Sequence, residues 1–337
     1  MASTRIRLGG IKILEGRSHL TSLCKGGEAA LADICSRLAA DRINLSLLTY
    51  ISDAVDGSGA SALSTDRADG FSAYFHLRAA QGCGSAVKLH PGVTVLSIFP
   101  HGQKACVIGE ILGMLTNNGI QPYGIASSTS ALSVLISSGD TPNGIDGLFG
   151  PFEFPTYRSP YDWHAAYREQ EHVLKEIICS YEEQVIKVYN IVKDCGLDLW
   201  RLRLPRRSLG GLGAAFLAMD RNGIRLPFLV AQLDEEESTL FAACLPSEHR
   251  QKIRHTLAFQ LPGIEPIHLD EVAMLSLHGP HFGDRYGIAR ALVSAMQSHE
   301  VAPLAISCTI ASISAVVRAD DVEKATAALG TSFQIPA

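Results

Sequence analysis

Hydrophobic positions near the C-terminal end of the chain follow the periodicities of strands and helices in turn. Residues 272–277 form an apolar run of strand length, and residues 288–296 carry apolar side chains at the spacing of an amphipathic helix. Two short strands, a second helix and a final strand are predicted at 303–307, 312–317, 322–329 and 332–335. The predicted order is β-α-β-β-α-β, which places two helices on one face of a four-stranded antiparallel sheet.

The same pattern occurs twice along the chain. The matching segments are 11–13 with 186–188, 43–48 with 224–230, 93–98 with 272–277, 127–136 with 307–317, and 152–155 with 333–336. All of these offsets lie between 175 and 181 residues, so we infer one duplicated half, with two smaller units in each copy. Between the copies, residues 161–184 are richer in charge and have helical spacing, which predicts a connecting helix.

Composition narrows the class of protein. Hydrophobic residues make up 47% of the 337 residues and charged residues 19%, as in globular chains. A net charge of -5 without a long basic run argues against a nucleic-acid binder, which needs a positive surface. The N-terminus has no apolar signal segment, and the uncharged stretch 111–139 is interrupted by Asn117, Asn118, Gln121 and Pro122. We therefore expect a cytoplasmic protein without a membrane span.

Cysteines, histidines and clusters of charged residues give weaker evidence for a functional site. The eight cysteines are scattered without a CxxC pair, which predicts buried free thiols in a reducing compartment. His278 and His281 have metal-ligand spacing but no further ligands nearby, so we predict no metal and no cofactor. Arg201, Arg203, Arg206 and Arg207 could bind an anion or lie on the outer face of a strand, and residues 234–237 are expected to form a solvated hairpin turn.

Several segments resemble ACT domains, the small ligand-binding regulatory modules, and in particular the tandem pair of aspartate kinases. The similar segments are the glycine-marked loop 284–290, the helix-to-strand turn 41–44, the serine-rich strand pair and residues 320–325. The resemblance implies an α+β fold of four ferredoxin-like βαββαβ ACT modules in two tandem pairs. The implied boundaries are 1–90, 91–158, a helical linker at 159–184, a divergent module at 185–262, and 263–337. The glycine-rich, lysine-bearing phosphate loop of a kinase domain is not found, so we expect no enzyme.

In ACT domains the effector commonly sits between paired modules, against the loop that enters the first helix and the start of the second strand. The backbone N–H groups of such a loop can take a carboxylate, and polar side chains can take an ammonium group. The resemblance therefore implies ligand-binding roles for Lys25, Gly26, Gly27, Asn44, Ser46, Gln103, Ser127, Asp284, Gly287 and Ser307. The glycines could equally be turn or cap residues, Asn44 an edge or capping residue, and Asp284 a loop cap.

The third module departs from this pattern, with Arg225 in place of Asn44 and Pro227 inside its strand. The leading hypothesis is a non-catalytic regulatory protein that senses a small metabolite, an amino acid, as a homodimer joined through free sheet edges. A partner enzyme is compatible with this role. The alternative is an interaction scaffold whose modules have lost ligand binding. A third hypothesis is an enzyme at a module interface, which requires His278, His281 and Asp284 to converge.

Overall fold

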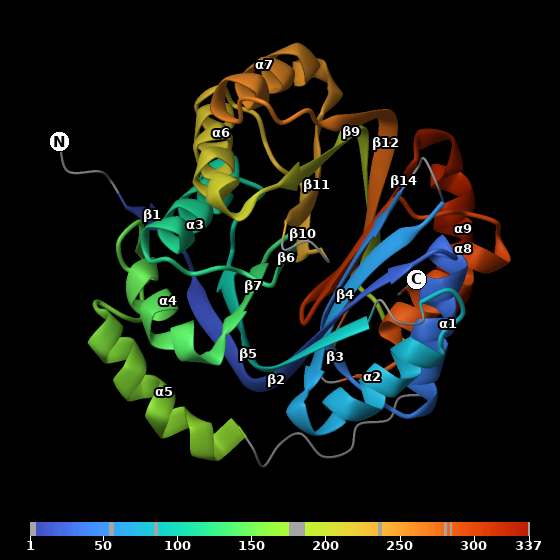
Figure 1. The fold of residues 1–337 in the computed structure, drawn as a ribbon, viewed down its shortest axis with the longest axis horizontal. Coiled ribbons are helices and arrows are strands. Elements are labelled where there is room, and N and C mark those ends of the chain that lie inside the picture. The colour runs from blue at the N-terminus through green and yellow to red at the C-terminus, as the bar shows by residue number, and fades with distance from the viewer. Residues whose placement is uncertain are drawn as a thin grey trace.

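The computed structural model describes residues 5–53, 57–83, 87–174, 186–234, 238–279, 282–283 and 285–335. The fold mixes helices and strands, as predicted (Figure 1). The helices are α1 (Gly27–Ala40), α2 (Gly70–Ala79), α3 (Ala105–Asn117), α4 (Thr141–Leu148), α5 (Pro160–Leu174), α6 (Leu209–Arg221), α7 (Arg250–Gln260), α8 (Ile288–Ser298) and α9 (Val322–Ser332). The strands are β1 (Ile6–Arg7), β2 (Gly10–Cys24), β3 (Leu45–Ser52), β4 (Gly59–Asp66), β5 (Val87–Phe99), β6 (Gly124–Ser127), β7 (Leu132–Ser137), β8 (Phe152–Glu153), β9 (Asn190–Leu204), β10 (Phe228–Leu233), β11 (Thr239–Pro246), β12 (Ile267–His278), β13 (Ala305–Thr309) and β14 (Ser312–Arg318).

One antiparallel sheet closes on itself. Its order is β10-β11-β9-β12-β14-β13-β3-β4-β2-β5-β7-β6, with β6 paired back to β10. Helices α3, α4, α6 and α7 lie on one side of it and α1, α2, α8 and α9 on the other (Figure 1). Because this closure uses the edges of the large sheet within the chain, the free-edge argument for a homodimer does not hold. The homodimer itself stays a prediction.

The long strands β2, β5, β9 and β12 each serve two neighbouring parts of the sheet. The second half of β2 pairs with β4 and the first half of β5, whereas the first half of β2 pairs with the second half of β5. Gly16 in β2 and Gly196 in β9 have φ of +65° and +72°, and the register of both strand pairs is irregular near them. These bulges bend each strand from one part of the sheet into the next.

The pairing divides the sheet into four groups of strands with helices on one face. Group A contains β3, β4 and the adjoining halves of β2 and β5; group B contains β6, β7 and the other halves of β2 and β5. Groups C and D repeat this arrangement with β10, β11, β13 and β14 around β9 and β12. Group A joins group D through β3 and β13, and group B joins group C through β6 and β10.

The predicted final strand at 332–335 is wrong. Helix α9 continues to Ser332, and the pairing there is an isolated bridge between Lys187 and Gln334. The strand position beside β12 is taken by the start of β9, where Met274 pairs with Asp194. A strand that comes from the beginning of the half thus completes group D, because β9 is long enough to reach both groups.

Buried serine pairs mark three of the four groups. Ser22 with Ser61, Ser97 with Ser133, and Ser276 with Ser314 lie directly opposite each other, with hydroxyl oxygens 2.7 Å apart in each pair. Group C has Leu202 opposite Phe241 instead, and both belong to the core beneath α6 and α7. The apolar pair extends the core of group C. Group C therefore differs from the other groups within the sheet as well as in its loops.

The connecting helix predicted near 161–184 is present as α5, and residues 175–185 lie outside the described part of the chain. It is not a simple solvated linker. Trp163 is buried in the core of group B and stacks on Tyr167 with ring centroids 4.9 Å apart. No helix in the described residues is long and apolar enough to cross a membrane.

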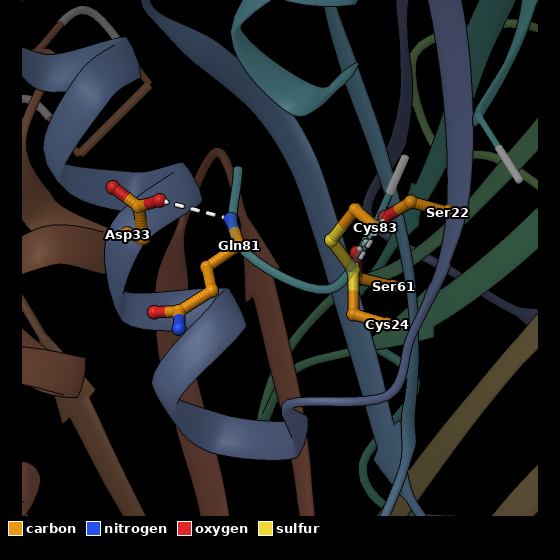
Figure 2. Close-up of a disulfide and its surroundings, with 6 residues drawn as sticks. All are labelled: Ser22, Cys24, Asp33, Ser61, Gln81 and Cys83. Carbon is orange, nitrogen blue, oxygen red and sulfur yellow. Dashed lines mark hydrogen bonds between the residues drawn. A yellow bond between two sulfur atoms is a disulfide. The ribbon is translucent and has the colours of Figure 1, made fainter. Parts of the chain in front are cut away.

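The prediction of free thiols is wrong for two cysteines. Cys24, at the end of β2, forms a disulfide with Cys83, in the loop after α2 (Figure 2). Cys35, Cys244 and Cys308 are buried free thiols, as predicted, whereas Cys195 is free and exposed. A 59-residue separation hides this pairing from any short motif, because only the fold brings the end of β2 to the loop after α2.

The fold also shows where two arginines of the predicted cluster lie, Arg201 and Arg203. Arg201 is buried on β9 and its Nη1 donates to the Ser52 carbonyl oxygen, so the outer-face interpretation is wrong for it. Arg203 donates to Asp234 at 2.7 Å, beside the turn between β10 and β11. Residues 235–237 of that predicted turn lie outside the described residues.

Candidate functional site

The candidate site lies where groups A and D meet on their helical side. Strand β3 pairs antiparallel with β13, from Ile51 opposite Ala305 to Leu47 opposite Thr309. This pairing sets α1 beside α8. A pocket between them is lined by Cys35, Leu38, Ala39, Ile43, Leu45, Phe282, Arg285, Gly287, Ile288, Ala289, Arg290 and Cys308. Residues from both groups therefore build one site.

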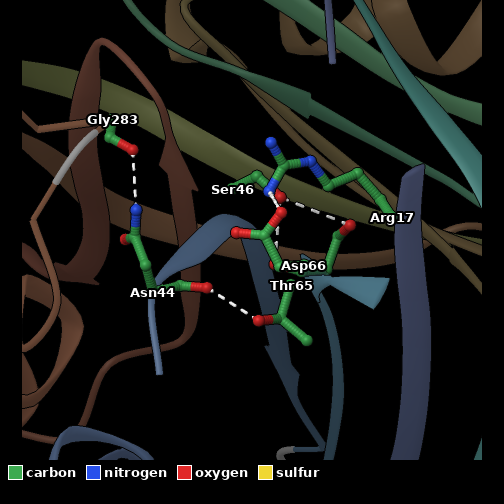
Figure 3. Close-up of polar contacts among 7 residues, drawn as sticks. Arg17, Asn44, Ser46, Thr65, Asp66 and Gly283 are labelled. Carbon is green, nitrogen blue, oxygen red and sulfur yellow. Dashed lines mark hydrogen bonds and ion pairs between the residues drawn. The ribbon is translucent and has the colours of Figure 1, made fainter. Parts of the chain in front are cut away.

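Asn44, between the pocket residues Ile43 and Leu45, joins the two groups. Its Nδ2 donates to the Gly283 carbonyl oxygen at 2.8 Å, across 239 residues of sequence (Figure 3). Its own backbone oxygen accepts a hydrogen bond from the Thr65 hydroxyl at 2.9 Å, which fixes the residue at the start of β3. The Asn44 Oδ1 atom is buried and has no hydrogen-bond partner among the described residues. The side chain therefore retains one buried acceptor.

Positive charge borders the pocket on the side of group D. Arg285 and Arg290 line it, and the first turn of α8 adds the positive end of a helix dipole. Gly287 caps α8 with φ of +86°, a left-handed conformation that favours glycine, and makes no side-chain cap hydrogen bond. The arrangement can hold an anionic group such as a carboxylate.

The remainder of the pocket is apolar and nearly filled. Leu38, Ile43, Leu45 and Phe282 surround a cavity of about 20 Å³, room for about one water molecule. Burial raises the pKa of the Cys308 thiol to about 12, and burial together with Cys308 does the same for Cys35. Both cysteines are therefore neutral pocket lining, and a ligand of amino-acid size requires the lining side chains to move apart.

Of the predicted site residues, Gly287 lines this pocket, and Asn44 lies next to it in the chain, between the lining residues Ile43 and Leu45. Lys25, Gly26 and Gly27 lie at the other end of α1, where Lys25 N donates to the Gly82 carbonyl oxygen at 3.2 Å. Gly27 has φ of +51°, and an added Cβ would lie 2.6 Å from the Gly57 oxygen, so glycine is required there on steric grounds alone. Asp284 lies outside the described residues.

The predicted serines point elsewhere. Ser46 donates to the Ser64 carbonyl oxygen at 3.1 Å, within the strand pair of group A (Figure 3). The Ser307 hydroxyl donates to the Ser127 carbonyl oxygen at 2.5 Å, and the Ser127 hydroxyl accepts from Leu229 N at 2.6 Å. These bonds tie β13 to β6 and β6 to β10. A ligand-binding role for these residues stays a prediction.

Gln103 lies at the second interface, between groups B and C. Its side-chain oxygen accepts from Arg225 at 3.2 Å, and its backbone oxygen accepts from Leu226 N at 2.8 Å. Arg225 also forms a two-point ion pair with Asp194, and this pair is the first cause of the raised Arg225 pKa. Close by, Asp220 Oδ1 accepts from Cys106 N at 3.1 Å. The two interfaces thus have the same topology, but one contains a pocket and the other contains an ion pair and hydrogen-bonded side chains.

His101 holds the Gln103 loop. Its Nδ1 accepts from Gln103 N at 3.1 Å, so its Nε2 is the protonated nitrogen that donates to the Ser128 oxygen at 2.6 Å. His278 contacts Thr129 through its Nε2, and burial lowers the His278 pKa. The described residues contain no group of three metal-binding side chains. His281 lies outside them, so the convergence of His278, His281 and Asp284 is untested.

Sequence reasoning missed Ala39, Phe282, Arg285 and Arg290 as pocket residues. A usable signal was the internal repeat, because the position of Ala39 in one half corresponds to Asp220 in the other. The repeat aligns an apolar residue, Ala39, with an acidic one, Asp220, and this mismatch indicates that the two equivalent interfaces differ.

Comparison with solved structures shows that the fold is similar to that of part of an aspartate kinase. Aspartate kinase from Synechocystis matches 98% of this chain at a TM-score of 0.76 and 14% identity, and the chain spans 58% of its length. The ligand-free regulatory subunit of aspartate kinase from Thermus thermophilus covers 44% of this chain with 99% of its own, at 19% identity and a TM-score of 0.40. The Thermus flavus regulatory subunit covers 43% with 98% of its own, at 18% identity and a TM-score of 0.39. No protein-family model and no curated protein matches this chain.

The prediction that the protein is not an enzyme is corrected by this comparison. The structure that matches nearly the whole chain is itself an aspartate kinase. At 14% identity the likeness establishes a shared fold, and the chain covers little more than half of that enzyme.

Proposed function

We propose that this chain is an amino-acid-sensing regulatory region of an aspartate-kinase-like protein. The groups A to D would be four ferredoxin-like ACT modules in two tandem pairs, as the ACT resemblance implies, with sequence boundaries at 1–90, 91–158, 185–262 and 263–337. The observation that carries the proposal is the pocket between α1 and α8, which is lined by two arginines at the start of α8. The buried, unpaired Oδ1 atom of Asn44 belongs to the residue between the lining residues Ile43 and Leu45.

These groups match the chemistry of a free amino acid. Arg285, Arg290 and the start of α8 would take the carboxylate, because positive charge and free backbone N–H groups both favour an anion. The Asn44 Oδ1 atom would accept a hydrogen bond from the ammonium group. The apolar lining would contact the side chain, so the residues around it would set selectivity among amino acids.

Ligand binding at this position would act on the relation between groups A and D. The pocket lies between elements of both groups, so a ligand there contacts both at once. It shifts their arrangement only to the extent that it binds one arrangement more tightly. The activity under this control would be phosphorylation of aspartate, in the same polypeptide or in a partner enzyme. The scaffold hypothesis is not favoured, because the pocket retains ligand-binding chemistry.

A thermal-shift screen against the twenty amino acids, followed by calorimetry, tests the proposal. A ligand present at a hundred times its dissociation constant stabilises the folded state by about 2.7 kcal/mol. The Arg290→Gln variant should weaken binding of the selected amino acid at least about tenfold, because a charged hydrogen bond is lost. Arg254→Gln, which alters an exposed arginine on α7, is the matched control and should bind normally. A folded protein that responds to none of the twenty amino acids would refute the proposal.

A further inference from the structure

We propose that the interface between groups B and C is permanently occupied by side chains of the chain itself, Asp220 and Arg225, so that each chain takes one effector, between α1 and α8. The single-effector part rests on the proposed function. The occupied interface rests on contacts that the structure shows directly.

Positive-φ residues establish which positions correspond in the two halves. Arg42 after α1 and Gly223 after α6 have φ of +56° and +71°, and each lies three residues beyond Ala39 or Asp220. In the partner helices, Gly119 after α3 and Glu300 after α8 have φ of +66° and +53°. Counting back equally from these two turns aligns Cys106 with Gly287. Asp220 facing Cys106 is therefore the counterpart of Ala39 facing Gly287.

Asp220 occupies the place that a ligand carboxylate would take. Its Oδ1 accepts the hydrogen bond from Cys106 N, in the first turn of α3, at 3.1 Å. An acidic residue in the last turn of its own helix α6 is unfavourable to that helix, whereas the same charge stabilises the start of α3. In the other interface, an added Cβ on Gly287 would lie 4.0 Å from the Ala39 Cβ, and the pocket opens there instead.

Arg225 closes the second interface on its other side. Where Asn44 keeps a buried acceptor without a partner, Arg225 is paired with Asp194 and donates to Gln103. Its neighbour Leu226 adds a backbone hydrogen bond to Gln103 at 2.8 Å. A ligand entering here would have to break an ion pair and these hydrogen bonds, which the other interface does not require.

The Cys106 thiol reports the presence of the carboxylate. A thiol in the first turn of a helix ordinarily has a lowered pKa. The pKa of Cys106 is instead raised to about 11, by burial first and then by the hydrogen bond and charge of Asp220. Removing the carboxylate should therefore make this thiol more reactive.

The first experiment uses Asp220→Ala and needs no knowledge of the effector. Acetate or formate should raise the melting temperature of this variant more than that of the wild type, because the small carboxylate replaces the lost side chain. Alkylation of Cys106 at pH 8, followed by peptide mass spectrometry, should be at least about tenfold faster, the change expected for one unit of pKa. Asp320→Ala, an exposed acid far along the chain, is the control and should show neither effect. Absence of both effects in folded Asp220→Ala would overturn the occupied interface.

The second experiment measures stoichiometry by calorimetry with the amino acid selected in the screen. One ligand per chain is expected, and Ala39→Asp should weaken its binding at least about tenfold by placing a carboxylate in the pocket. Two equivalent ligands per chain would overturn the inference and leave the proposed function intact. If no amino acid binds, the proposed function and the single-effector part fail together, and the acetate and alkylation results still decide whether the second interface is occupied.

Discussion

Gly109 of α3 lies directly against Gly213 of α6. A Cβ added to Gly109 would stand 2.8 Å from the Gly213 oxygen, and one added to Gly213 would stand 3.0 Å from the Gly109 oxygen. The two backbones can approach this closely because neither residue has a side chain. The contact fixes the spacing of the helices that carry Asp220 and Cys106, so the occupied interface depends on it.

An alanine at this crossing should destabilise the protein. Gly109→Ala is expected to lower the free energy of unfolding by about 1–3 kcal/mol, because the methyl group overlaps backbone and Leu217. Gly113→Ala, one turn further along α3, is the matched control, since no atom lies within 4 Å of its added Cβ. That variant should be neutral or slightly stabilising. Equal urea-denaturation midpoints for the two variants would contradict the close crossing.

Stability should fall at acid pH because of His19. This side chain on β2 is fully buried, and burial, together with the charge of His90, lowers its pKa to about 3. The unfolded chain binds a proton below a pH of about 6.5, whereas the folded state resists it down to about 3. Between these values the free energy of unfolding should drop by up to about 1.4 kcal/mol per pH unit.

His19→Gln should remove this part of the pH dependence. Urea denaturation from pH 7 to pH 4 measures the slope, and His255→Gln on α7 is a control at an exposed histidine position. Because both variants retain the same carboxylates, their difference isolates His19. Parallel curves would contradict a buried neutral His19.

Loss of the Cys24–Cys83 disulfide should also destabilise the chain. The bond closes a loop between residues 59 apart, which restricts the unfolded state by an amount typically worth about 2–4 kcal/mol. The Cys24→Ser/Cys83→Ser variant should unfold at lower urea, with reductant making little further difference. Cys195→Ser, at an exposed free cysteine, should behave as wild type. Unchanged stability and thiol count on reduction of the wild type would show that the bond is absent.

Asp198 should contribute stability that disappears in acid. Burial alone would raise its pKa, but the hydrogen bonds from Arg250 and the His268 ring, whose Nε2 lies 3.0 Å from Oδ2, hold it below the usual range. The carboxylate accepts from Arg250 at 2.7 and 2.9 Å. Asp198→Asn should cost about 1.5–3 kcal/mol at pH 7, since a charged hydrogen bond is lost.

The Asp198 contribution has a defined pH window. A depressed carboxyl pKa stabilises the fold above the unfolded value of about 4, and this stabilisation is lost as pH falls. The gap between wild type and Asp198→Asn should therefore narrow in acid. Asp146→Asn, which alters a half-exposed acid, is the control. A gap independent of pH would contradict the ionised buried carboxylate.

Local pattern sufficed for the elements of the last unit except its final strand. The apolar spacing at 288–296 corresponds to α8, and the runs at 272–277 and 312–317 lie in β12 and β14. These elements depend on neighbours within a few residues, whose periodicity is written in the chain. The predicted strand at 332–335 failed because its position beside β12 had been filled by β9, from the other end of the half.

The candidate site could be predicted from the sequence only in part. Asn44 and Gly287 were predicted from a resemblance; Gly287 lines the pocket, and Asn44 bonds to Gly283 from the turn between the lining residues Ile43 and Leu45. Arg285 and Arg290 could be recognised as pocket residues only once the fold showed that α1 lies beside α8. Arg225 was noted as a departure from the pattern, whereas its pairing with Asp194 appeared only in the fold.

The sequence by itself determined the α and β elements, the duplication with its regular offset, and the divergence of the third unit at Arg225. Tertiary structure decided that the sheet closes on itself, that Cys24 meets Cys83, and that Asp220 caps α3 while Ala39 leaves a pocket at α8. The physical reason is the separation along the sequence between the residues that interact. Helix and strand periodicity arises from backbone geometry between near neighbours, whereas sheet closure, disulfide pairing and occupancy of an interface depend on which distant side chains are buried against each other.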